Sequence, residues 1–222
     1  MFRVFKIFQK LIFGMTKEFI TLEELDVSSS YKLLIQLVIP RPIAWVSTRS
    51  AQGSTNLAPF SYFNLVSTKP SVLMISFNYS ETKGFKDTYR NIKESLEFGV
   101  NLPRFEQMEL VVSSAADYPY GTSEIDALNI DTFQSKLINA PLVSDCHINF
   151  ECKYLQEAHF GEGPGSCWVV FGNILAVHID KSLFEGDLII NPRKLNPLCR
   201  LGRSQYSSLG EIKEMPVPKI KL

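Results

Sequence analysis

The feature that most constrains the fold is a succession of short segments rich in β-branched and aromatic residues, each bounded by glycine, proline, serine or asparagine. Such segments favour strands, because branched and aromatic side chains pack well on a pleated surface and the bounding residues favour turns. They occupy residues 43–48, 57–66, 72–79, 96–102, 148–156, 168–179 and 187–190. Several short strands at this spacing predict a mainly β protein, a β-barrel with peripheral helices.

Three segments are expected to form helices beside these strands. The sequence YKLLIQL follows Ser28 to Ser30, which can cap a short helix that Pro40 must end. A second helix is predicted from Asp87 to about Glu94, and a third from Glu106 through Ala116, where apolar residues recur at helical spacing. No GxGxxG motif follows a first strand, which argues against a Rossmann domain.

The chain of 222 residues, 45% of them hydrophobic, is long enough to bury one sizeable core. We therefore predict a single domain over residues 15–222, preceded by an extension over residues 1–14. The segment 191–222 contains four prolines, Pro192, Pro197, Pro216 and Pro218, and is expected to be a loose tail that could wrap a neighbouring molecule.

The extension MFRVFKIFQKLIFG would form a basic amphipathic stripe on a helix, because its phenylalanines alternate with arginine, lysine and glutamine. Three interpretations remain open: a helix that packs on the domain or on a dimer mate, a membrane-surface anchor, or a dispensable segment upstream of Met15. The first and third are favoured. No apolar run approaches the roughly 20 residues that a membrane span requires.

Charge and cysteine usage narrow the class of protein. Lysine plus arginine equals aspartate plus glutamate at 23 each, so no net charge attracts a polyanion, which argues against a nucleic-acid partner. The four cysteines form no CxxC pair and fit reduced thiols in a cytoplasm. Cys146, His147 and Cys152 lack a fourth ligand at zinc-like spacing, so no metal site is expected.

The most informative stretch is residues 40–63, PRPIAWVSTRSAQGSTNLAPFSYF. Two antiparallel strands joined by a tight turn at Gly53 would offer backbone amides and small polar side chains beside an aromatic surface. That combination suits a planar, polar-edged, phosphorylated ligand. On spacing alone, an ordinary hairpin with one hydrophobic face is the simpler interpretation.

A second stretch, KGFKDTYRN at residues 83–91, places Lys86, Asp87 and Thr88 at the predicted start of a helix. Free backbone amides, a hydroxyl and a lysine together make a plausible phosphate site. On this stretch alone the simpler interpretation is that Asp87 is only the N-cap, with Lys86 solvated.

These stretches together resemble a known family. PRPIAWVST, NLAPFSYF, KDT followed by Asn91, ECK at residues 151–153 and RLGRSQY are similar to the flavin reductase-like family, over about residues 31–206. That family has an FMN-binding split-barrel fold and usually forms homodimers with the flavin near the subunit interface. The resemblance therefore implies FMN as the cofactor, an FMN-binding split β-barrel over residues 15–222 and a homodimer.

The resemblance also implies a set of residues that contact the flavin. They are Arg41, Pro42, Ala44, Ser47, Thr48, Asn56, Ala58, Ser61, Lys86, Asp87, Thr88 and Tyr206. Lys86, Asp87 and Thr88 match the phosphate end, and Tyr206, with Arg200, could close the site from the same or the partner subunit. Each of these residues could instead have a structural role; Pro42, for example, could simply shape a bend.

The implied activity is hydride transfer from NADH or NADPH to the flavin, followed by delivery of electrons to a second acceptor. Such chemistry belongs to the cofactor and requires no side-chain acid or nucleophile, so no catalytic residue is assigned. Residues 163–174, GPGSCWVVFGNI, replace a Gly-Asp-His signature that some of these reductases carry for nicotinamide handling. Two alternatives stay open: an FMN-binding electron carrier reduced by a partner protein, or a ligand-binding barrel without enzymatic activity. For His159 and His178 a structural role is expected.

Overall fold

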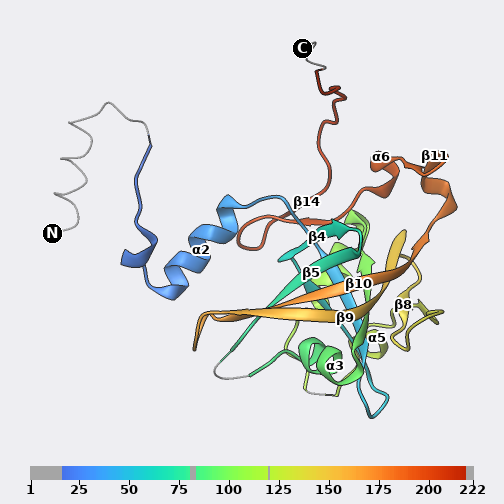
Figure 1. The fold of residues 1–222 in the computed structure, drawn as a ribbon, viewed down its shortest axis with the longest axis horizontal. Helices are drawn as coiled ribbons and strands as arrows, with labels where there is room; N and C mark the ends of the chain where they lie inside the picture. Colours follow the sequence, from blue (N-terminus) through green and yellow to red (C-terminus); the bar gives the residue numbers. More distant parts are fainter. Residues whose placement is uncertain (1–16, 81–83, 120, 219–222) are drawn as a thin grey trace.

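The computed structural model describes residues 17–80, 84–119 and 121–218; the extension predicted over residues 1–14 lies outside them. At its centre is a seven-stranded antiparallel sheet in the order β3-β2-β6-β9-β10-β5-β4. The strands are β2 (Ala44–Arg49), β3 (Thr55–Phe60), β4 (Phe63–Thr68), β5 (Ser71–Asn78), β6 (Glu97–Leu102), β9 (Ile148–Phe160) and β10 (Cys167–Ile179). The mainly β prediction is therefore confirmed, and β9 and β10 form a long ribbon across the molecule (Figure 1).

Shorter elements surround this sheet. A three-stranded sheet has the order β1 (Arg41–Pro42), β13 (Cys199–Arg200) and β14 (Tyr206–Ser207). Two further sheets have two strands each: β7 (Thr132–Phe133) pairs with β8 (Leu142–Val143), and β11 (Phe184–Gly186) pairs with β12 (Ile189–Ile190). The α-helices are α2 (Val27–Leu37), α3 (Asp87–Ser95), α4 (Met108–Ser113), α5 (Glu124–Ala127) and α6 (Pro192–Leu195). The 3₁₀-helices are η1 (Leu22–Glu24), η2 (Phe105–Gln107) and η3 (Lys181–Leu183).

Strand β2 separates two hydrophobic cores, because successive side chains of a strand point to opposite faces. Ala44 and Val46 face the core of the barrel, whereas Trp45 faces a second core that includes Leu57 and Val111. Both faces of β2 are therefore buried. This burial accounts for the apolar run at residues 43–46, and Ser47 and Thr48 are buried with it.

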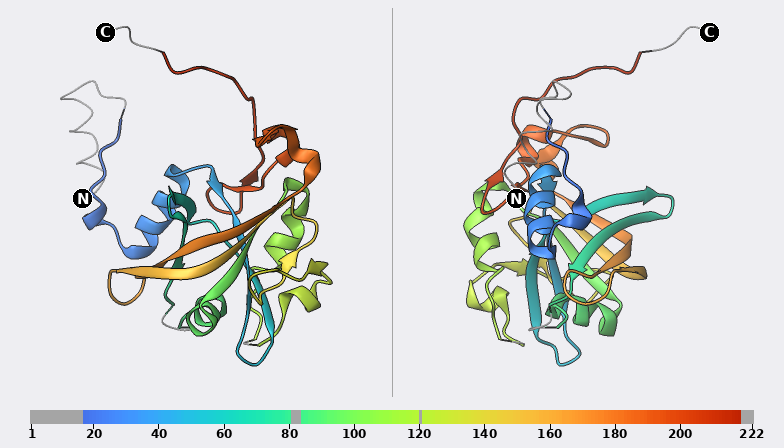
Figure 2. Two further views of the ribbon diagram at one scale, coloured as in Figure 1. Left: turned by 45° about the vertical axis from the view of Figure 1, so that its right-hand side comes forward. Right: turned by 90° about the vertical axis from the view of Figure 1, so that its left-hand side faces the viewer.

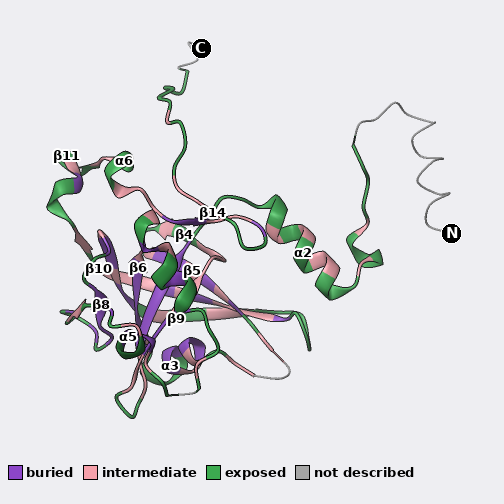
Figure 3. Ribbon diagram, turned by 180° about the vertical axis from the view of Figure 1, so that it is seen from behind, coloured by how far each residue is buried: buried purple, intermediate pink, exposed green. Residues whose placement is uncertain are grey.

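Helix α3 packs against the barrel through Tyr89 and Ile92, which belong to the barrel core. Its inward face is buried and its outward face is exposed (Figure 3). Helix α3 contacts β2, β3 and β6, and Thr88 of its first turn accepts a hydrogen bond from Asn56 of β3, so this turn lies beside β3. This arrangement positions the cavities described below.

Three of the predicted elements differ from the structure. Residues 57–66 are not one strand, because the chain leaves the β2 edge of the sheet after Phe60 and pairs with β5 from Phe63 onward. The helix predicted over residues 106–116 begins as η2 and ends at Ser113. The cap of α2 is Asp26, whose carboxylate accepts from the amide of Ser29, and not one of the serines.

The predicted loose tail is wrong for residues 192–207. Here α6 forms, β13 pairs with β1, and β14 pairs with β13, so this segment is part of the folded domain. From Ser208 the chain runs without regular structure and leaves the body of the molecule (Figure 2). Within the described ranges, no helix is long and apolar enough to cross a membrane.

Candidate functional site

Two adjoining cavities lie beside the first turn of α3. The larger has a volume of about 490 Å³ and the smaller about 290 Å³. Asn56 of β3 and Asp87 of α3 line both of them. The two cavities therefore form neighbouring parts of one site, between β3, α3 and the chain around residues 114–122.

One part of the lining of the larger cavity is apolar. Ala58, Pro59 and Phe60 of β3 line it together with Phe85. Phe85 stacks on Tyr89 with ring centroids 4.8 Å apart and meets Trp168 edge-on, also at 4.8 Å. Because these rings support one another, the wall offers a preformed surface for a planar ligand.

The positive end of α3 faces the larger cavity. Lys86 is at the N-cap position but forms no side-chain cap, and Asp87 is the first helical residue, so the capping interpretation of Asp87 is wrong. Lys86 is exposed and lines the cavity with Asp87 and Thr88. A helix start without a side-chain cap, next to a lysine, is a suitable site for an anion such as a phosphate group.

The larger cavity is also lined by a buried carboxylate that the sequence analysis missed. Glu124 is 7% exposed, accepts a hydrogen bond of 2.8 Å from the backbone amide of Leu57 and lines the larger cavity. Burial raises the pKa of its carboxyl, although the Leu57 bond opposes the shift and the charge of Asp87 adds to it. Burial likewise raises the pKa of Asp87. Only the cap at Ser123 before Glu124 marks this helix in the sequence.

The wall at residues 114–119 was also missed by the sequence analysis, which placed residues 106–116 in a helix. Its position depends on Trp45, whose indole Nε1 donates to the hydroxyl of Ser114 over 2.8 Å. Ser114 is 2% exposed and lines the larger cavity with Ala115, Ala116, Asp117, Tyr118 and Pro119. Trp45 thus fixes this wall from the second core.

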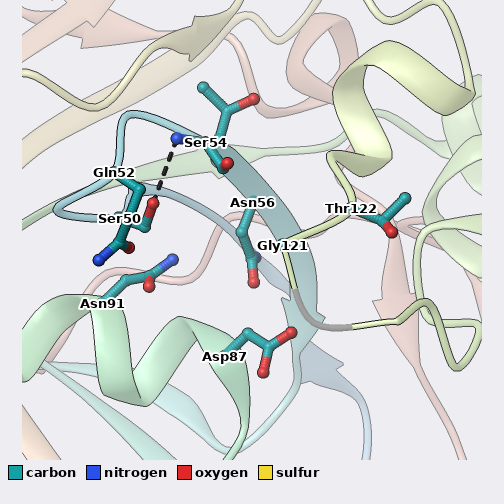
Figure 4. A pocket seen from close by; sticks show the side chains of 9 residues that line it. Ser50, Gln52, Ser54, Asn56, Asp87, Asn91, Gly121 and Thr122 are labelled. Atoms are coloured by element: carbon teal, nitrogen blue, oxygen red, sulfur yellow. Dashed lines mark hydrogen bonds between the residues drawn. The ribbon is translucent and has the colours of Figure 1, made fainter.

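The smaller cavity is lined by hydroxyl and amide side chains (Figure 4). Ser50 accepts from the amide of Ser54 over 3.1 Å and so shapes the turn after β2. Asn91, on the second turn of α3, donates through Nδ2 to Oγ1 of Thr48 over 2.9 Å. Its other polar atom, Oδ1, is buried and has no hydrogen-bond partner among the described residues.

The structure brings five of the twelve predicted site residues together. Asn56, Ala58, Lys86, Asp87 and Thr88 all line the larger cavity. Asn56 donates through Nδ2 to Oγ1 of Thr88 over 3.1 Å, so two of the predicted residues also position each other.

Three more predicted residues lie on β2 and line neither cavity. Ala44 is in the barrel core, and Ser47 and Thr48 are fully buried. Ser47 accepts from Asn101, whereas Thr48 accepts from Asn91. Their direct contact with a flavin stays a prediction, and Thr48 reaches the smaller cavity only through Asn91.

The remaining four lie around the small sheet of β1, β13 and β14. The guanidinium of Arg41 donates to the carbonyls of Ile35, Val38 and Leu201 and to the hydroxyl of Ser61. Pro42 pairs with Cys199, and Tyr206 hydrogen-bonds Arg200. Contact of Arg41, Pro42, Ser61 and Tyr206 with a flavin stays a prediction.

The histidines have packing partners outside the two cavities. His159 stacks on Trp168 with ring centroids 4.1 Å apart, and Nε2 of His178 lies 2.6 Å from Oε1 of the buried Glu151.

Burial raises the pKa of Cys146 to about 12, as expected of an unreactive thiol. Within the described part of the chain no group of three or more histidine, cysteine or acidic residues could hold a metal ion.

Comparison with known proteins gives this site its context. The family model described as a flavin reductase like domain matches residues 37–198. The chain belongs to the flavin reductase-like family. This flavin reductase-like chain is also 34% identical over 192 residues to an uncharacterized protein of Aquifex aeolicus, a match that covers 86% of the chain and 96% of the relative. Membership of the family places the chain among flavin-related oxidoreductases.

Solved structures agree with the fold. Component B of nitrilotriacetate monooxygenase from Bacillus cereus superposes with a TM-score of 0.86 at 30% identity, covering 90% of this flavin reductase-like chain and all (100%) of the other. A flavin reductase-type protein with a split barrel domain from Shewanella frigidimarina superposes with a TM-score of 0.77 at 18% identity, covering 89% and 96%, and supports the fold alone. The predicted split-barrel fold is thereby confirmed.

Proposed function

We propose that this flavin reductase-like protein binds FMN in the two cavities and acts as an FMN-dependent oxidoreductase. The observation that carries the proposal is the larger cavity, which is lined both by apolar residues of β3 with Phe85 and by the start of α3 with Lys86. A planar ring with a phosphorylated side chain needs both features in one site.

The residues present fit this group. Lys86 and the first amides of α3 would hold the phosphate, and the wall formed by Ala58, Pro59 and Phe60 would support the ring. The unpaired Oδ1 of Asn91 is a further indication that the site is built for a ligand, because a buried acceptor without a donor is costly unless a bound group supplies one.

When bound, FMN would supply the redox chemistry by accepting a hydride from NADH or NADPH and passing electrons to a second acceptor. The chain's own residues would orient the ring, neutralise the phosphate and limit the access of water. Delivery to a separate protein is supported by the Bacillus cereus relative, which is one component of a monooxygenase.

The test is a visible absorption spectrum of the purified protein, loaded with FMN, desalted, and followed anaerobically after addition of NADH or NADPH. Flavin bands that are retained and bleach rapidly would support the oxidoreductase. A protein that neither retains FMN nor reduces added FMN with either nucleotide would overturn it.

A second candidate is an FMN-binding electron carrier that a partner protein reduces. It is favoured by residues 163–174, GPGSCWVVFGNI, which do not contain the Gly-Asp-His signature expected for nicotinamide handling. The same spectrum separates the two candidates, because a carrier would keep its flavin bands in the presence of NADH or NADPH and lose them with a chemical reductant.

We also infer that the protein is a homodimer. Helix α2 has no buried residue, and Val27, Tyr31, Leu34 and Val38 form an apolar stripe at helical spacing, each at least 40% exposed. Arg41 ties the C-terminal end of α2 to the domain, but the apolar stripe itself stays exposed, and such a stripe is typical of a surface that a second protein molecule covers. Figure 1 shows α2 at the side of the barrel, where a second copy can cover it.

Light scattering during gel filtration tests the dimer. The wild-type protein should elute with twice the mass of one chain, and Leu34→Asp should shift it towards the monomer. Glu23→Asp, in the exposed η1, is the control. A wild-type monomer would contradict the inference.

Because all four cysteines are free, a reducing cytoplasm remains our proposed location.

A further inference from the structure

The side chain of Asn91 has one buried acceptor, Oδ1, without a hydrogen-bond donor among the described residues. Asn91 is 3% exposed and lines the smaller cavity, and its Nδ2 is already committed to Thr48. Oδ1 has no partner in the described part of the chain. Since a buried acceptor without a partner costs about 1–3 kcal/mol, a ligand that donates to it gains affinity.

The lining of the smaller cavity selects the kind of donor. Serine, threonine, asparagine and glutamine side chains line it, and Asp87 is the single charged residue among its described lining residues. With a carboxylate and an unpaired carbonyl oxygen, and no described cation, the cavity disfavours a phosphate group. It suits an uncharged group that both donates and accepts, and adjacent sugar hydroxyls have that property.

We propose that the smaller cavity is a sugar-hydroxyl subsite, in which Oδ1 of Asn91 accepts a hydrogen bond from a hydroxyl of the ligand. The inference rests on the proposed function, because the hydroxyls belong either to the ribityl chain of a flavin or to the ribose of a nicotinamide nucleotide. In both cases Asn91 is a positioning residue that holds the ligand through its sugar.

The position of Asn91 supports this role. The bond to Oγ1 of Thr48 holds the amide group in one orientation, and Thr48 is itself fully buried on β2. Asn91 is four residues after Asp87 on α3, so both side chains lie on the same face of the helix and meet the same cavity (Figure 4). A sugar held by Asn91 would therefore lie next to the start of α3, where the phosphate is expected.

The test compares riboflavin with lumiflavin, which has the same ring without the ribityl chain, by quenching of flavin fluorescence. Asn91→Leu removes the acceptor and should reduce the preference for riboflavin over lumiflavin roughly tenfold. Asn91→Asp retains an acceptor oxygen and should keep most of that preference. Asn64→Leu, on the exposed part of β4, is the control for loss of an amide, and circular dichroism verifies folding of each variant.

A second arm identifies the source of the sugar. If the hydroxyls belong to a nicotinamide nucleotide, Asn91→Leu should leave the riboflavin preference unchanged and weaken binding of ADP-ribose roughly tenfold. Unchanged binding of both probes in a folded Asn91→Leu protein would overturn the proposal. A wild-type protein that binds riboflavin without preference over lumiflavin, and does not bind ADP-ribose, would overturn it while leaving flavin binding intact. Failure to bind any flavin would instead refute the proposed function.

Discussion

The side-chain amide of Asn56 donates to Oγ1 of Thr88 over 3.1 Å, and this bond joins β3 to the first turn of α3. Both residues are buried, at 6% and 1% exposure, and both line the larger cavity. The distance between the apolar wall and the start of the helix therefore depends on this pair.

Thr88→Val should loosen that connection. The change keeps the shape of the side chain but leaves the amide of Asn56 without its acceptor, so the free energy of unfolding should fall by about 1–2 kcal/mol. FMN binding should weaken with it, because the start of α3 is less well held. Urea unfolding and FMN titration measure the two effects, with Thr68→Val on the exposed end of β4 as control. Wild-type stability in Thr88→Val would show that the bond is unimportant.

Lys86→Ala should discriminate between phosphorylated and unphosphorylated flavin. Removing the cation beside the start of α3 should weaken FMN roughly tenfold and riboflavin much less, and the difference should shrink at high salt. Titration of both ligands at low and high ionic strength gives the result. Lys181→Ala, on η3, controls for the loss of a surface lysine. Equal losses of affinity for FMN and riboflavin would mean that the phosphate does not bind at this end of the cavity.

Arg41→Met should destabilise the protein in the absence of any ligand. Arg41 is 7% exposed, and its guanidinium donates to the carbonyls of Ile35 and Val38 at the end of α2 and to the carbonyl of Leu201 after β13. Leaving these carbonyls unpaired should cost roughly 3 kcal/mol of unfolding free energy and speed hydrogen exchange in α2.

The exposed Arg193 supplies the matched control for Arg41, as Arg193→Met. Should Arg41→Met leave the ligand-free protein as stable as the wild type and weaken only FMN binding, the direct flavin contact implied by the family resemblance would be the better account of Arg41.

Glu124→Gln should change how stability depends on pH. Burial raises the pKa of Glu124, so the folded state holds this proton more tightly than the unfolded state does. The stability of the wild type should therefore fall as pH rises from below the ordinary pKa of a glutamate through the raised pKa. Glutamine keeps an acceptor for the amide of Leu57 but does not titrate, so the variant should lose less stability over the same range.

Chemical unfolding at a series of pH values checks this expectation, and Glu162→Gln in the exposed loop before β10 is the control. Parallel pH curves for wild type and Glu124→Gln would mean that Glu124 titrates alike in both states.

The amino-acid sequence by itself determined the local structure. Branched and aromatic runs predicted β2, β5, β6, β9 and β10, because strand formation depends on side chains that the chain carries at regular spacing. The sequence also predicted that α3 starts at Asp87, because the start of a helix depends on residues that are close together in the sequence.

Only the tertiary structure decided which of these local features meet. Strand β3 ends at Phe60 because the pairing partner of the chain changes from β2 to β5, and this change depends on closure of the sheet. Ser47 and Thr48 are fully buried on β2 and line neither cavity, because both faces of β2 are covered. Glu124 meets Leu57 across 67 positions of sequence. Contacts of this range depend on the packing of the whole domain, which no local pattern of residues encodes.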